Sequence, residues 1–292
     1  MDEHPSLEWL DQVELERPVL VAAFRGWNDA GEAASFSAQH LARVWGAKRF
    51  ASVDPEEFYD FQAVRPQVRL VDGLTREITW PSNEFWGAEL SGAPHDAILL
   101  VGTEPSHRWK AFSRMIVDVA RRANVELVIT LGALLADVPH SRETLVTGTA
   151  GDEQLIDRLG LQRSRYEGPT GIVGVLHDAF AKAKVPSASL WAAVPHYLAV
   201  SPNPKAALAL VNKTVELIQA SVDVGDLVAA ARVYEEKVDE IVSDDEDVKT
   251  YVRLLEERAD EQGREEQIDL TDLPSGDRIA AELEDFLRKR ET

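Results

Sequence analysis

The chain has no cysteine among its 292 residues. Disulfides, thiolate metal sites, iron–sulfur clusters and a cysteine nucleophile are therefore excluded. Its 7 histidines show no H-E-x-x-H or comparable ligand spacing, and no G-x-S-x-G elbow marks a nucleophilic serine. The sequence therefore predicts neither a metal site nor another cofactor, and it identifies no catalytic residue.

Long apolar runs are also lacking, since no stretch approaches the roughly eighteen apolar residues that a membrane-spanning helix needs. The first residues, MDEHPSLEWLDQVELE, are acidic where a secretory signal would carry positive charge. We therefore expect a soluble cytoplasmic protein that does not bind membranes.

Basic residues are scarce. Lys and Arg number 31 against 51 Asp and Glu, which gives a net charge of −20 and a pI near 4.7. Such a charge repels polyanions and argues against a nucleic-acid partner. The imbalance is greatest in residues 225–292, which hold 22 acidic and 10 basic residues, and this indicates a change of structure near residue 225.

Short apolar segments alternate with helical patterns along residues 18–220. Expected strands cover residues 18–24, 48–53, 97–101, 125–131 and 188–194, and the main intervening helices cover residues 30–45, 110–122, 172–184 and 204–220. This alternation predicts an α/β fold with a mainly parallel central sheet flanked by helices. A hairpin over residues 68–71 and 76–80 interrupts the pattern. Residues 1–16 are expected to form a surface arm, and the alternative is a lead-in whose Leu7, Trp9 and Leu10 dock on the body.

Residues 225–292 show only helical periodicity, so we expect an α/β domain over residues 1–224 and an acidic helical extension over residues 225–292. The extension has three apolar stripes, and each needs a surface to cover. The first consists of Leu227, Val228, Ala231, Tyr234, Val238 and Ile241, the second of Val248, Tyr251, Val252 and Leu255, and the third of Ile279, Leu283, Phe286 and Leu287.

The strand over residues 18–24 is followed by a polar turn that leads into a helix. Gly26, Trp27, Asn28, Asp29 and Gly31 occupy this turn, where ligands of α/β sheets usually bind. One interpretation is a backbone cradle for an anion or polar ligand. The other is a structural turn in which Asp29 caps the helix. The turn matches neither the dinucleotide fingerprint nor the Walker loop.

Two more polar segments are candidate parts of the same site. Glu104 and Arg108 follow the strand over residues 97–101. One interpretation makes Glu104 an acid and Arg108 an oxyanion clamp, and the other makes the two a structural ion pair. Thr170 and Gly171 precede a helix. They either bind an anion at its N-terminus, or Thr170 is the helix cap.

Five ordered segments together resemble one known family. They are F-x-G-W-N-D-A-G at residues 24–31, D-P-E-x-F-Y-D-F with a following R-P at 54–66, G-x-E-P-x-x-R-W at 102–109, G-P-T-G-I-V-G-V-L-H at 168–177, and W-A-A-V-P-H-Y-L with P-N-P-K-A at 191–206. They resemble the proteasome assembly chaperone 2 family in its actinobacterial form. D-L-P-S-G-D at residues 272–277 is similar to the same branch.

The resemblance implies an α/β sandwich similar to the phosphorylase/hydrolase-like fold, self-association, and binding of proteasome α subunits as in eukaryotic relatives. It brings no catalytic residues. Related chaperones often end in a hydrophobic-Tyr-x pattern, whereas this chain ends in LRKRET. We therefore expect a non-enzymatic, homo-oligomeric protein-binding factor. The alternative is a protein that binds a nucleoside-like or anionic small molecule, or a hydrolase- or phosphorylase-like enzyme, which uses the strand-end loops.

Overall fold

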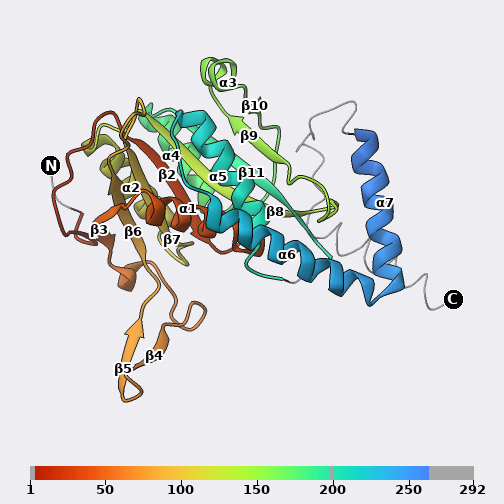
Figure 1. The fold of residues 1–292 in the computed structure, drawn as a ribbon. Helices are drawn as coiled ribbons and strands as arrows, with labels where there is room; N and C mark the ends of the chain where they lie inside the picture. Colours follow the sequence, from red (N-terminus) through yellow and green to blue (C-terminus); the bar gives the residue numbers. More distant parts are fainter. Residues whose placement is uncertain (1–3, 198–199, 263–292) are drawn as a thin grey trace.

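The computed structural model describes residues 4–197 and 200–262, and a nine-stranded mixed sheet forms its centre. The strand order is β1-β3-β6-β7-β2-β8-β11-β9-β10 (Figure 1). In this order the strands are Leu7–Trp9, Lys48–Val53, Asn83–Ala88, Ala97–Thr103, Val19–Arg25, Leu127–Ala136, Ser187–Pro195, Val146–Ala150 and Gln162–Arg163.

The four central strands β7, β2, β8 and β11 are parallel to their neighbours. On one side of them β6, β3 and β1 pair in antiparallel fashion, and on the other side β9 runs antiparallel to β11. The predicted fold class is therefore confirmed, with a sheet that is parallel in its core and mixed towards its edges.

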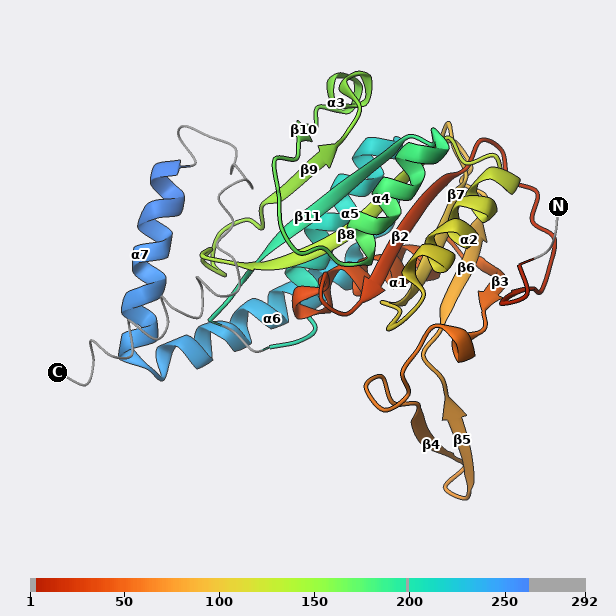
Figure 2. The same cartoon turned by 180° about the vertical axis from the view of Figure 1, so that it is seen from behind.

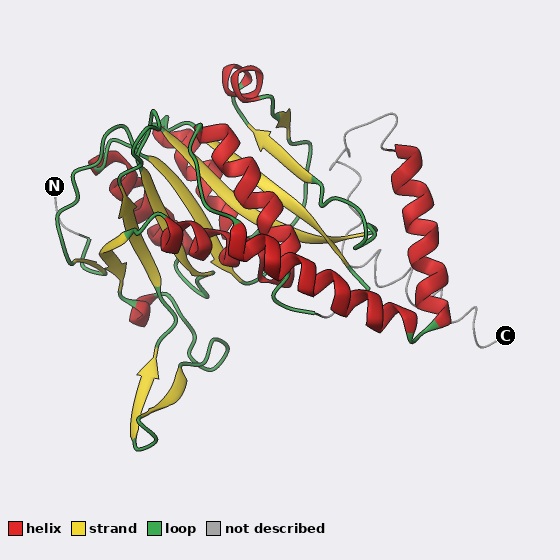
Figure 3. Ribbon diagram, viewed as in Figure 1, coloured by secondary structure: helices red, strands yellow, loops and turns green. Residues whose placement is uncertain are grey.

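Strand β2 is buried on both faces. Val19, Val21 and Ala23 contribute to one apolar core, while Leu20 and Phe24 point into the other. Helices α1 (Ala33–Val44) and α5 (Pro204–Ile218) cover the first face, and α2 (Trp109–Arg122) and α4 (Ile172–Ala183) cover the second (Figures 1 and 2). Two layers of helices thus enclose the sheet, as Figure 3 shows with helices in red and strands in yellow.

Two elements at the β1 edge differ from the expectation. Strand β6 was not predicted, although it joins β3 to β7. The expected surface arm instead supplies β1, whose Trp9 stacks on Phe50 with 6.0 Å between ring centroids. The Arg122 guanidinium lies 4.2 Å from the Trp9 ring. Pairing with β3 and this aromatic contact hold the segment on the body, which sequence periodicity over three residues could not indicate.

The predicted hairpin is confirmed. Strands β4 (Gln67–Val71) and β5 (Thr75–Thr79) form a separate two-stranded sheet that projects from the body (Figure 1). Short helical segments complete the α/β part, namely η1 (Ala30–Glu32), η2 (Pro55–Glu57) and α3 (Glu153–Leu159).

The acidic extension begins with α6 (Gly225–Ser243) and α7 (Glu246–Gln262). Leu227 joins the core beside α5, whereas Val238 packs in a smaller apolar cluster with Val252. Val228 and Ile241 were expected on the apolar stripe but are about half exposed, and Val242 is buried instead. The third expected helix lies outside the described residues, and the division into two domains at residue 225 stays a prediction.

One partly buried histidine, His177, links α4 to the sheet. The His177 Nε2 lies 2.8 Å from Thr130 Oγ1, and its Nδ1 lies 2.9 Å from Ser187 Oγ. Burial lowers the pKa of His177 from 6.5 to about 4, because the interior disfavours the charged imidazolium.

The unfolded chain therefore binds a proton to His177 between these two pKa values, while the folded chain does not. We expect the free energy of unfolding to fall as the pH drops through this window, with His177 accounting for about 2 kcal/mol between pH 8 and pH 5. Urea unfolding at both pH values measures it. The pH dependence should shrink in His177→Gln and persist in the control His107→Gln, where the ring is exposed. Equal pH dependence in both variants would contradict the assignment.

Candidate functional site

The polar turns that follow the central strands meet at one edge of the sheet, because parallel strands end on the same side. The Glu104 N–H donates to Arg25 O at 2.8 Å, and the Ala133 N–H donates to Asn28 O at 2.9 Å. On the far side of the turn, the Asn203 N–H donates to Gly31 O at 2.7 Å. These bonds join the segments after β2, β7 and β11 to strand β8, and we call this edge the rim.

Glu104 connects two parts of the rim through its side chain. Its Oε1 accepts the Ile172 N–H at 2.7 Å, and its Oε2 lies 3.4 Å from the Trp27 nitrogen. Helix α4 begins at Ile172, and its N-cap residue Gly171 offers no side-chain acceptor. The carboxylate therefore supplies both the acceptor and the negative charge that a helix N-terminus favours.

Close approach explains two glycines of the turn after β2. Gly26 has φ +135°, and a Cβ there would lie 3.0 Å from Glu104 Cβ. Gly31 has φ +59°, and its Cβ would lie 3.0 Å from Asn203 Cβ. Both positions combine a backbone angle that L-residues disfavour with a near neighbour, so glycine is required there.

Asp29 serves as a helix cap, as one of the two interpretations held. Its Oδ1 accepts the N–H groups of Ala34 at 2.8 Å and Ser35 at 3.1 Å in the first turn of α1. Burial raises the pKa of Asp29 above its ordinary value, although the bonds from Ser35 and Ala34 act in the opposite direction. Among the described residues, Asp29 Oδ2 and the neighbouring buried Asn28 Nδ2 have no hydrogen-bond partner.

Not every candidate residue joins this group. Arg108 pairs with Glu57 rather than with Glu104, so the expected structural ion pair between Glu104 and Arg108 is not found, and the acid with an oxyanion clamp stays a prediction. Thr170 is not a cap, because α4 begins only at Ile172 and the Thr170 hydroxyl lies 3.4 Å from Gly171 O. The structure thus brings Gly26, Trp27, Asn28, Asp29, Gly31, Glu104 and Gly171 to the rim, and their role in binding a ligand stays a prediction.

A second polar group beside β7 was missed in the sequence. Tyr59 donates its hydroxyl to Thr103 O at 2.6 Å, and Asn83 donates its amide to the Tyr59 oxygen. Burial raises the pKa of Tyr59 well above its ordinary range. No motif marks Asn83, which lies in the unpredicted strand β6. Tyr59 was visible only within the D-P-E-x-F-Y-D-F motif of residues 54–66.

Helices α6 and α7 of the acidic extension contact the neighbouring part of the rim. His140 follows β8, and its Nε2 lies 2.9 Å from Asp239 Oδ1 of α6. Arg142 binds Asp260 of α7 through two bonds of 2.7 and 2.8 Å. Tyr197 follows β11, and its hydroxyl lies 2.7 Å from His140 Nδ1. Acidic side chains of α6 and α7 thus pair with basic and imidazole side chains of the loop after β8.

Metal ligands and membrane-spanning helices were sought in the part of the chain that the structure describes. There, no group of three or more His, Asp and Glu side chains is placed to hold a metal ion. Within the same residues, no helix has the length and apolar character needed to cross a bilayer.

The fold and the rim define an α/β sandwich protein whose strand-end loops are bonded to one another. The PAC2 family matches residues 23–242, and the chain therefore belongs to the PAC2 family. This confirms the resemblance seen in its five sequence segments. A comparison with curated proteins gives no match.

Several solved structures are similar to the chain. A PAC2 family protein from Streptomyces avermitilis is 46% identical, with a TM-score of 0.75 over 80% of this chain and 99% of its own. A proteasome-assembly chaperone homologue from Mycobacterium tuberculosis is 43% identical, with a TM-score of 0.73 and the same coverage. A second M. tuberculosis protein, of unknown function, is 26% identical, with a TM-score of 0.82 over 90% of this chain and 94% of its own.

The bridging role of Glu104 is testable. Glu104→Ala leaves the buried Ile172 N–H without its acceptor, so we expect the free energy of unfolding to fall by about 2 kcal/mol. Asp178→Ala is the control, because it removes a carboxylate of the same helix α4 whose ion pair with Lys182 is mostly exposed, and it should cost less than about 1 kcal/mol. Urea denaturation of both variants gives the comparison, and equal losses would count against the bridge.

Proposed function

We propose that this PAC2 protein is a protein-binding factor of the proteasome-assembly-chaperone kind, which acts as a homo-oligomer and without catalysis. The main support is the M. tuberculosis proteasome-assembly chaperone homologue, which is 43% identical over 80% of the chain. The chemistry of the rim and the exposed surface of the hairpin support the same proposal.

The rim offers little for an enzymatic alternative. Glu104 is occupied by two backbone N–H groups, Asp29 caps a helix, and Arg108 pairs with Glu57. Catalytic groups need a reactive atom free to meet a substrate. Among the described residues of the rim, the unpartnered Asn28 and Asp29 atoms favour a small polar ligand, and both residues are more than nine-tenths buried.

The β4–β5 hairpin supplies a surface suited to protein contact. Val68 pairs with Ile78, and Leu70 lies two residues along on the same face, where it pairs with Arg76. Val68, Leu70 and Ile78 are 55–62% exposed. The opposite face carries the ion pair between Arg69 and Glu77. An isolated two-stranded hairpin is marginally stable in water, so burial of this apolar face against a partner would stabilise it.

A second copy of the chain is the partner that we assign to this face. With a net charge of −20, two bodies repel each other on close approach. The hairpin projects from the body (Figure 2), and this repulsion is screened over about 8 Å in physiological salt. Contact through the projecting arms therefore brings apolar faces together with less electrostatic cost than contact between the acidic bodies.

Self-association is tested by charge substitution on the hairpin. Ile78→Glu places a carboxylate in the apolar face, so we expect the dissociation constant of the oligomer to rise at least about tenfold. Thr79→Glu adds the same charge to the opposite face and should leave the oligomer intact. Sedimentation velocity over a concentration series measures both variants. A monomeric parent chain, or an unchanged Ile78→Glu oligomer, would remove this part of the proposal.

The partner itself is tested with proteasome subunits. The full chain should associate with isolated α subunits or with early assembly intermediates, and not with β subunits alone, because the resemblance implies recognition of α subunits. Native mass spectrometry and co-purification provide the measurement. The absence of association at every assembly stage would overturn the chaperone role while leaving self-association untouched.

A further inference from the structure

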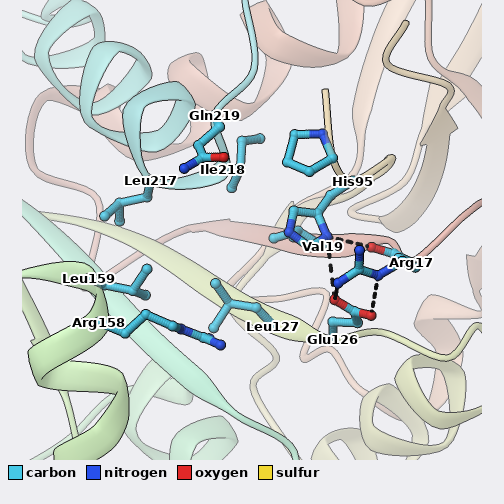
Figure 4. Close-up of a pocket in the computed structure, with 11 residues that line it drawn as sticks. Arg17, Val19, His95, Glu126, Leu127, Arg158, Leu159, Leu217, Ile218 and Gln219 are labelled. Atoms are coloured by element: carbon cyan, nitrogen blue, oxygen red, sulfur yellow. Dashed lines mark hydrogen bonds and ion pairs between the residues drawn. The ribbon is translucent and has the colours of Figure 1, made fainter. Parts of the chain in front are cut away.

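A cavity of about 280 Å³ lies at the end of the sheet opposite the rim. Strands β2 and β8 begin there, at Val19 and Leu127, and α5 ends beside them at Ile218 (Figure 4). These three apolar side chains are each less than 7% exposed and form the floor. Charged side chains, from residues just before the strands and from α3, surround this apolar floor.

The charges around the cavity do not balance. Arg17 is neutralised by Glu126, to which it donates bonds of 2.6 and 2.9 Å. Arg158, an exposed residue in the last turn of α3, also lines the cavity. It helps to lower the pKa of the Glu126 carboxyl, although the Arg17 hydrogen bond is the largest cause of that shift. None of the ion pairs between described residues includes Arg158. One positive charge therefore remains at the cavity, in a chain whose net charge is −20.

The polar wall is held in place before any ligand binds. Arg17 has a φ of +50°, a rare angle for a residue with a side chain. Its carbonyl oxygen lies 3.0 Å from His95 Nδ1, and its guanidinium is fixed by the two bonds to Glu126. Figure 4 shows these contacts as one connected group beside the apolar floor. Such fixed geometry lowers the entropic cost of binding.

The end of α5 does not cancel the positive charge. A helix C-terminus carries partial negative charge on its free carbonyl groups. Here the Glu216 and Val215 carbonyl oxygens accept the N–H groups of Gln219 and Ala220, which reduces that effect. The full charge of Arg158 therefore sets the sign of the cavity.

We propose that this cavity binds a small organic anion, whose acidic group pairs with Arg158 and whose apolar part packs on Val19, Leu127 and Ile218. A volume near the lower limit of known ligand pockets restricts the ligand to a short chain or a single ring. The proposal is independent of the proteasome role, because the cavity lies at the other end of the sheet from the rim and does not include the hairpin.

The test uses hexanoate as the probe for an acid with an apolar body. Hexan-1-ol supplies the same body without charge, and inorganic phosphate supplies charge without the body. In calorimetric titrations of the full chain at constant ionic strength, hexanoate should bind about tenfold more tightly than either. Arg158→Gln should weaken hexanoate binding about tenfold and leave hexan-1-ol binding unchanged.

Arg163→Gln is the matched control, because Arg163 is exposed like Arg158 but pairs with Glu153 and does not line the cavity. It should bind hexanoate like the parent chain. Equal affinity of the parent and Arg158→Gln for hexanoate would overturn the proposal. Phosphate binding as tight as hexanoate binding would overturn the role of the apolar floor. If Arg163→Gln weakens hexanoate binding as much as Arg158→Gln does, the effect is one of general charge and the site is overturned.

Discussion

The structure depends on strand β2 being bonded along both edges and buried on both faces. Its backbone pairs with β7 on one side and β8 on the other, so its polar groups are satisfied without water. Its side chains alternate between two apolar cores, and helices must cover both. Since β7, β8 and β11 follow its direction, the turns after these strands meet at one edge. The rim is thus a consequence of how β2 is buried.

Electrostatics explains much of what surrounds this core. The chain is acidic throughout, and its last quarter most of all, yet α6 and α7 remain close to the body. They do so where His140, Arg142 and Lys205 provide partners for Asp239, Asp260 and Glu235. A small apolar cluster that includes Val238 and Tyr197 lies in the same region. Charge complementarity and modest apolar burial therefore act together, which suits an extension that carries little core of its own.

Much of the fold was predictable because it follows local patterns. Strand β3 was predicted with its observed bounds, and the expected strands at β2, β7 and β11 and helices at α2, α4 and α5 were found within a few residues. Strand β6 was missed because Asn83–Ala88 lacks a long apolar run and contains a glycine, and pairing with two neighbours is what stabilises it. At the rim, the turn glycines and Asp29 could be recognised from residue type. The pairing of Arg108 with Glu57 could not, because 51 residues separate them.

Composition and local patterns were enough to predict the α/β class, the family, the acidic charge and the positions of the polar turns. Each of these follows from composition or from patterns within a few residues, where helix and strand periodicity acts. The tertiary structure decided which turns touch. Glu104 reaches Trp27 across 77 residues and Ile172 across 68, and the Arg17–Glu126 pair of the cavity spans 109. Such contacts depend on strand order and register, which no local segment encodes.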